Sequence, residues 1–310
     1  MERTVIRTLR ANPALAVFAL LNTAFVPVAL VGLLVDDRIV ADSPLWFKPL
    51  KFALSLALYS VSLAWALSLT TRLRRFTRWA GTLAAAGGTV EMAIIVGQAA
   101  RGRRSHFNTA TELDSTLYAV MGATITAVWV VHALVVLALL FSRFEDRTTA
   151  VALRFGMGVA LAGMAVGFLM TSPAEGQDPA LGLVGAHTVG APDGGPHLPL
   201  TGWSTTGGDL RVSHFIGMHA LQALPLAMAL LPRLASPRLA RDLGLAWAGL
   251  TALTLWQALR GQPPLRPDAL TLAGLAALLA WTGWALWRAD RERARRAAVE
   301  PARDAAAVAA

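Results

Sequence analysis

Two apolar stretches of this sequence carry ionisable side chains, and these are the first candidates for chemistry. Glu91 lies near the middle of residues 81–100, and His214 and His219 lie within the first eight residues of 212–231. A charged side chain on a lipid-facing helix costs about 2.5–3.5 kcal/mol on insertion scales. We therefore expect Glu91 to face protein or water and to have a polar partner there, and the two histidines are the obvious candidates for that partner.

Depth in the membrane groups Glu91 with other polar residues. With a rise of about 1.5 Å per residue, Glu91 and His219 both lie roughly 12–14 Å from the outer ends of their helices, whereas His132 lies roughly 20–24 Å deep. Four segments contribute polar residues to this outer level, namely Lys51, Glu91, Gln98, His106, Asn108, Asp209, Arg211, His214, His219 and Gln222. The sequence therefore predicts a polar site in the outer half of the membrane.

The residue types in this cluster indicate possible roles. Glu91 and His219 are the candidate catalytic acid–base groups. Imidazole and carboxylate ligands suit zinc, copper or non-haem iron, and two histidines suit a b-type haem, so the candidate metal ligands are Glu91, His106, His214 and His219. Lys51 and Arg211 are candidate anion-binding groups, and the other predicted ligand-binding residues are Gln98, Asn108, Asp209 and Gln222. The roles of His132, His187 and His197 stay open.

Three functions are compatible with such a site. A metal, haem or quinone-type redox ligand ranks first. A proton-coupled small-solute transporter, in which Glu91, His219 and His132 form a descending relay, is the alternative. A structural or partner-binding role, with Glu91 ion-paired to Lys51 or an arginine, is the third. The chain has no cysteine, which excludes iron–sulfur clusters and c-type haem.

The composition indicates which elements must position these residues. Hydrophobic residues make up 55% of the 310-residue chain, charged residues 15%, and the mean hydropathy is +0.52. A soluble domain is less apolar and more charged than this. Eight apolar runs are long enough to cross a hydrocarbon core of about 30 Å, at residues 14–35, 47–69, 79–100, 117–141, 151–171, 212–231, 243–259 and 269–287. The sequence thus predicts an all-α, polytopic transmembrane bundle of about eight spans, with residues 1–290 as a single domain.

The basic residues predict the orientation of the bundle. With the N-terminus in the cytoplasm, cytoplasmic segments hold 19 of the 28 Lys and Arg residues, as the positive-inside rule requires. Both termini are therefore predicted to be cytoplasmic, and residues 291–310 form an Arg/Ala-rich cytoplasmic tail. This topology also accounts for the net charge of +9 without a nucleic-acid partner. The expected partners are the lipid bilayer and a small-molecule or ion ligand.

Connections and packing complete the prediction. Residues 172–210 form a connection of 39 residues with nine glycines and five prolines, which we interpret as a series of tight turns that caps the outer face. Small residues at helical spacing from Ala152 to Gly167 predict a close helix–helix contact. The first four and last four predicted helices are compatible with a parallel duplication, on the slight similarity of residues 52–58 and 219–224.

Overall fold

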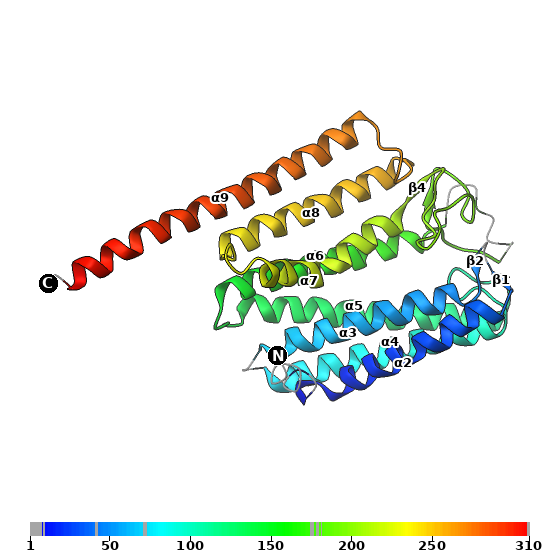
Figure 1. Ribbon diagram of the computed structural model, residues 1–310. Helices are drawn as coiled ribbons and strands as arrows, with labels where there is room; N and C mark the ends of the chain where they lie inside the picture. Colours follow the sequence, from blue (N-terminus) through cyan, green and yellow to red (C-terminus); the bar gives the residue numbers. More distant parts are fainter. Residues whose placement is uncertain are drawn as a thin grey trace.

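The part of the protein that the structure describes contains eight helices of 21 to 40 residues, joined by loops and short strands. The computed structural model describes residues 8, 10–40, 43–70, 73–173, 177, 180 and 182–308. Residues 1–7 of the predicted domain, 174–176, 178–179 and 181 of the predicted loop, and 309–310 of the predicted tail lie outside the described residues. The helices, which Figure 1 labels, are α2 (Pro13–Val35), α3 (Phe47–Ser68), α4 (Arg74–Ala100), α5 (Glu112–Phe141), α6 (Arg147–Met170), α7 (Leu210–Leu230), α8 (Pro237–Leu259) and α9 (Ala269–Val308).

Each predicted apolar run falls on one of these helices, so the prediction of an all-helical membrane protein is confirmed. Six helices are long and apolar enough to cross a membrane, namely α2, α3, α4, α5, α6 and the first 30 residues of α9. The other two, α7 and α8, are long enough but less apolar. Because α7 packs between α6 and α8, it need not be apolar on all sides. Helix α9 continues through residue 290, where the predicted tail begins.

Side-chain caps explain where several helices begin. Asn12, Thr111, Asp146, Asp209 and Ser236 each precede a helix and accept a hydrogen bond from a backbone amide two or three residues later. Such a cap stabilises a helix by about 1 kcal/mol, because the first amides of a helix have no partner within it.

The small residues of α6 bring it very close to α7, as the sequence predicted. A Cβ atom added to Gly163 would lie 2.6 Å from the backbone of Gly217, and one added to Gly156 would lie 2.9 Å from the carbonyl oxygen of Ala220. Only glycine permits this approach, which maximises van der Waals contact between the two backbones.

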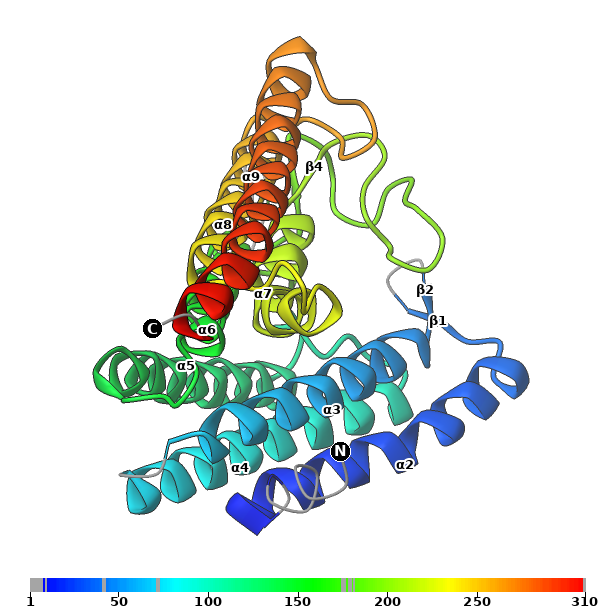
Figure 2. The same cartoon turned by 60° about the vertical axis from the view of Figure 1, so that its left-hand side comes forward.

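The eight helices form two halves of four, α2–α5 and α6–α9, which are separate groups in Figure 2. In each half the first helix packs against the second and third, and the third packs against the second and fourth. Between the halves, α5 packs against α6. The order of packing is therefore the same in both halves.

A short sequence motif recurs at the same place in each half. Residues 98–102 read Gln-Ala-Ala-Arg-Gly at the end of α4, and residues 257–261 read Gln-Ala-Leu-Arg-Gly at the end of α8. Both glycines adopt a left-handed backbone, with φ of 67° at Gly102 and 69° at Gly261. Both arginines pair with an aspartate near the start of the next helix, Arg101 with Asp114 at 2.8 Å and Arg260 with Asp268 at 2.6 Å.

Each half also has a pair of short antiparallel strands between its first and second helices. Strands β1 (Ile39–Val40) and β2 (Ser43–Pro44) connect α2 to α3, and β3 (Thr188–Val189) and β4 (Gly208–Asp209) connect α6 to α7. All four lie at the end of the bundle opposite the start of α2 and the end of α9 (Figure 1). We call this the strand end and the other the far end.

Candidate functional site

A cavity of about 210 Å³ lies at the strand end of the bundle. Its walls come from residues 40 and 43–45 before α3, the start of α3, the end of α4, residues 103–107 after α4, the loop 187–204 and the start of α7. The cavity therefore lies where both halves of the molecule and both strand-containing connections meet. We call it the strand-end cavity.

Five lysine and arginine side chains line this cavity, namely Lys48, Lys51, Arg103, Arg104 and Arg211. The chain has only two lysines, and both are in this set. Among the described residues, no carboxylate lies within ion-pair distance of Lys48, Arg103 or Arg104. The lining thus holds basic side chains that no described carboxylate pairs with and that can donate hydrogen bonds to an incoming anion.

Lys51 and Arg211 converge from opposite halves of the molecule. The Lys51 ammonium donates to the carbonyl oxygen of Thr201 at 3.3 Å, and Arg211 donates through Nε and Nη2 to the carboxylate of Asp209. A Cβ atom added to Gly202 would lie 3.6 Å from Nη1 of Arg211 and 3.7 Å from Nζ of Lys51. Nζ of Lys51 and Nη1 of Arg211 are therefore no more than about 7 Å apart, on either side of Gly202.

Asp193 is the acidic residue among the described residues of the lining, and its oxygens already accept hydrogen bonds within the loop. It accepts from the backbone amides of His187 and Thr188, from the Thr188 hydroxyl and from Nδ1 of His187 at 3.2 Å. Burial alone would raise the pKa of Asp193, but the hydrogen bonds from His187 and Thr188 outweigh it and hold that pKa below its usual value. Burial also lowers the pKa of His187, so a neutral ring donates to a charged carboxylate.

Glu91 lies behind the wall of the cavity and contacts His106. Its Oε1 is 3.3 Å from Nε2 of His106, and Nδ1 of the same ring is 3.0 Å from the Ser105 hydroxyl. Burial lowers the pKa of His106 well below its usual value, and nearby Lys48 acts in the same direction. Glu91 is 3% exposed, and its Oε2 has no hydrogen-bond partner among the described residues. The imidazole thus separates the carboxylate from the cavity.

The expected pairing of Glu91 with the histidines of α7 is not what the described contacts show. Nδ1 of His214 lies 2.8 Å from the carbonyl oxygen of Gly163, and Nδ1 of His219 lies 2.7 Å from that of Phe215. Glu91 is on α4, which packs within the first half, whereas both histidines are on α7 in the second half. Equal depth therefore does not imply contact. Among the described residues, no group of three His, Cys, Asp or Glu side chains is placed to hold a metal ion.

Four other predicted ligand-binding residues hold the scaffold together and do not line the cavity. Gln98 donates to Asp114 at 2.8 Å, and Asn108 donates to the carbonyl oxygen of Arg104 at 3.0 Å. Asp209 caps α7 and fixes Arg211, and Gln222 donates to the Ser62 hydroxyl at 3.0 Å. Of the predicted site residues, the lining includes Lys51, His106 and Arg211.

Six further residues line the cavity that the sequence did not predict as site residues, namely Lys48, Arg103, Arg104, His187, Asp193 and His197. One signal was present in the sequence. Every basic residue other than Lys48 and Lys51 is an arginine, and those two lysines lie three residues apart at the start of a predicted span. A lysine is a compact point charge that arginine does not replace at every site.

His132, whose role the sequence left open, joins three helices. Its Nε2 lies 3.1 Å from the carbonyl oxygen of Met157 on α6, and its Nδ1 lies 3.0 Å from the Tyr59 hydroxyl on α3. A carbonyl oxygen only accepts, so Nε2 carries the hydrogen, and Nδ1 of the neutral ring accepts from Tyr59. The side chain thus connects the two halves at their α5–α6 contact.

The molecule is a helical membrane protein with buried charged residues, and its described contacts draw basic side chains from both halves into one cavity. The chain matches no protein-family model, no curated protein and no solved structure.

Proposed function

We propose that this membrane protein binds a small oxyanion, a free phosphate or a short carboxylate, in the strand-end cavity. The observation that carries the proposal is the set of five basic side chains in the lining, two of which are the only lysines of the chain. Lysine and arginine bind phosphate and carboxylate groups through charge-assisted hydrogen bonds, which are about twice as strong as neutral ones.

The size and charge of the cavity support a small ligand. Pockets for drug-sized molecules have volumes of roughly 300–1,000 Å³, and this cavity is smaller, at about 210 Å³. Asp193 offsets part of the positive charge, but its hydrogen-bonding capacity is used by His187 and Thr188. A bound oxyanion would reduce the repulsion between Lys51 and Arg211, which gives the site a reason to prefer anions.

The proposal includes the full predicted topology. In this arrangement α7 and α8 are two further spans, both termini are cytoplasmic, and the loop 172–210 covers the cavity on the outer face. The support is the excess of arginine at the far-end connections and the contribution of residues 187–204 to the cavity lining. The ligand would then enter the cavity from the side of the membrane opposite the cytoplasm.

A metal or haem centre, ranked first on the sequence, has less support than an anion site. Glu91 and His106 form a pair, while His214 and His219 donate elsewhere. We therefore assign Glu91 a positioning role, in which it orients the His106 ring at the cavity wall, and we assign His219 no catalytic role. A test of this assignment is the affinity for phosphate in Glu91→Gln, which we expect to stay within about threefold of the unaltered protein.

The experiment that tests the proposal is thermal unfolding of the detergent-purified protein with inorganic phosphate, succinate, the short-chain lipid dihexanoyl phosphatidate, or choline. A ligand at 100 times its Kd stabilises the folded state by about 2.7 kcal/mol. We expect phosphate or succinate to raise the unfolding temperature and choline to have no effect. Stabilisation by the phosphatidate alone would identify a lipid headgroup site, and no response to any anion would refute the proposal.

A further inference from the structure

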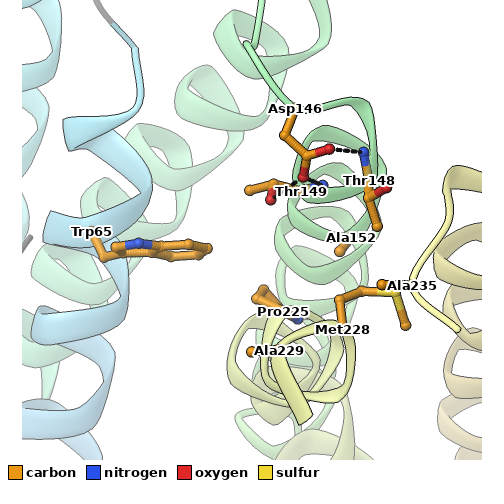
Figure 3. A pocket seen from close by; sticks show the side chains of 9 residues that line it. All are labelled: Trp65, Asp146, Thr148, Thr149, Ala152, Pro225, Met228, Ala229 and Ala235. Carbon is orange, nitrogen blue, oxygen red and sulfur yellow. Dashed lines mark hydrogen bonds between the residues drawn. The ribbon is translucent and has the colours of Figure 1, made fainter. Parts of the chain in front are cut away.

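A second cavity, of about 370 Å³, lies at the far end of the bundle. Figure 3 shows Trp65 of α3 extending towards Pro225 of α7, with Asp146 at the start of α6 on another side. Ala229 lies on the side of α7 nearer α3, and the Met228 side chain extends towards Ala235. We call this the far-end cavity. Helices α3 and α7 thus both contribute to the strand-end cavity and to the far-end cavity.

Both helices begin at the strand end and end at the far end, and they meet between the two cavities. Lys51 and Arg211 meet beside Gly202, Ser62 and Gln222 share a hydrogen bond, and Trp65 and Pro225 face the far-end cavity. The members of each pair are 160 residues apart. Helices α3 and α7 are the second helices of the two halves, so these pairs occupy equivalent positions in the repeat.

Polar groups close the seam between α3 and α7 near its middle. Ser62 lies about 16 Å along α3 from Lys51, at a rise of about 1.5 Å per residue. The amide nitrogen of Gln222 donates to the Ser62 hydroxyl at 3.0 Å, while the amide oxygen of Gln222 is buried with no partner among the described residues. A buried acceptor without a donor is unfavourable, so the closed seam holds an unmet hydrogen bond.

The contact between α5 and α6 is a firmer connection between the halves. Nε2 of His132 lies 3.1 Å from the carbonyl oxygen of Met157, the Trp129 indole donates to that of Leu161 at 3.1 Å, and Arg154 donates to that of Leu139 at 3.0 Å. These bonds are distributed along α5 and α6. The arrangement resembles a hinge on one side of the molecule and a weakly closed seam on the other.

We propose that the seam between α3 and α7 is a transport path, and that the oxyanion of the strand-end cavity crosses the membrane between the two cavities as the halves tilt about α5 and α6. The inference rests on the proposed anion binding. Repeats with an axis along the membrane normal, and a path between them, are a known plan for membrane carriers. The charges give the path a direction: five basic side chains line the strand-end cavity, whereas the carboxylate of Asp146 lines the far-end cavity and favours release of an anion there.

Cysteine accessibility tests the path without any background, because the chain has no cysteine of its own. Gln222→Cys and, separately, Ser62→Cys are treated with the membrane-impermeant anionic reagent 2-sulfonatoethyl methanethiosulfonate in right-side-out and in inverted vesicles. We expect each cysteine to react from both sides. Inorganic phosphate at about ten times its Kd should slow both reactions roughly tenfold, by occupying the path. Two positions are used so that a folding defect in one variant leaves the other informative.

The control is Leu279→Cys, since Leu279 is 64% exposed on α9 and faces lipid in the membrane; it should not react. Cysteines at 62 and 222 that react from one side only, or from neither, would overturn the transport path even if phosphate binds the purified protein. Absence of binding of both phosphate and succinate to the purified protein would instead refute the proposed function and the path with it. Uptake of ³²P-phosphate into proteoliposomes that is lost in Lys51→Met would support the path.

Discussion

Replacing Lys51 with methionine removes the charge of one cavity lysine and keeps most of the length of its side chain. The affected contacts are the hydrogen bond to the carbonyl oxygen of Thr201, the proximity to Arg211 and the position of the ammonium 4.5 Å from the centre of the Phe47 ring. If Lys51 serves anion binding, the variant should lose affinity for phosphate and remain nearly as stable as the unaltered protein. If Lys51 had a structural role instead, the variant would keep its affinity for phosphate and lose stability.

The structure sets the expected magnitudes. Two unit charges about 7 Å apart repel by about 2 kcal/mol at an effective dielectric constant of 20. Asp209 beside Arg211 and solvent in the cavity reduce the gain from removing this repulsion to about 1 kcal/mol, and loss of the Thr201 hydrogen bond costs about 1 kcal/mol. The ligand-free stability should therefore change by less than about 1 kcal/mol. A lost charge-assisted hydrogen bond of about 1.5–3 kcal/mol weakens phosphate binding by roughly 10–150-fold.

The assay is titration of inorganic phosphate into the detergent-purified variant, with thermal unfolding of the ligand-free protein measured beside it. Arg74→Met is the matched control, because Arg74 is an exposed basic residue at the far end, and its affinity should be unchanged. Unaltered phosphate affinity in Lys51→Met, or a loss of more than about 2 kcal/mol of ligand-free stability, would refute the reasoning.

Three further predictions concern the scaffold. Gly163→Ala should lower the free energy of unfolding by about 1–3 kcal/mol because its Cβ overlaps the α7 backbone, whereas Gly158→Ala, with nothing within 4 Å, should not; thermal unfolding checks both. The pKa of His106 lies below its unfolded value of about 6.5, so folding favours the neutral ring. The contribution of His106 to the free energy of unfolding is therefore complete above pH 6.5 and falls as the pH drops below it, by at most about 1.4 kcal/mol per pH unit. His106→Asn should flatten the stability profile between about pH 7.5 and 5.5. Asp242→Asn should cost about 3 kcal/mol because its buried carboxylate pairs with two arginines, while Asp290→Asn, whose side chain is 64% exposed, should cost less than about 0.5 kcal/mol; equal unfolding temperatures would contradict the prediction.

The elements were predictable from the sequence because they depend on local patterns. Each of the eight apolar runs falls on a helix, and the small residues around Gly163 mark the contact with α7. Hydrophobic length and helical spacing are properties of one segment, so no knowledge of its neighbours is needed.

The partner of Glu91 was not predictable from depth alone. Depth along a helix is one coordinate, and it says nothing about which half of the bundle a helix joins. Glu91 and His219 were expected to meet at equal depth, yet the imidazole beside Glu91 belongs to His106, in the connection directly after the same helix. The only sequence feature that indicated Lys48 is the scarcity of lysine, which occurs twice in the chain.

The measurement that tests the anion site most directly uses the fact that the chain has only two lysines. Reductive ¹³C-methylation preserves the charge of a lysine and would label Lys48, Lys51 and the N-terminal amine, so the NMR spectrum should contain two lysine signals, with the Lys51 signal missing in Lys51→Met. We predict that inorganic phosphate shifts both signals with one common Kd and that choline shifts neither. Lysine signals that do not respond to phosphate or succinate would contradict the account.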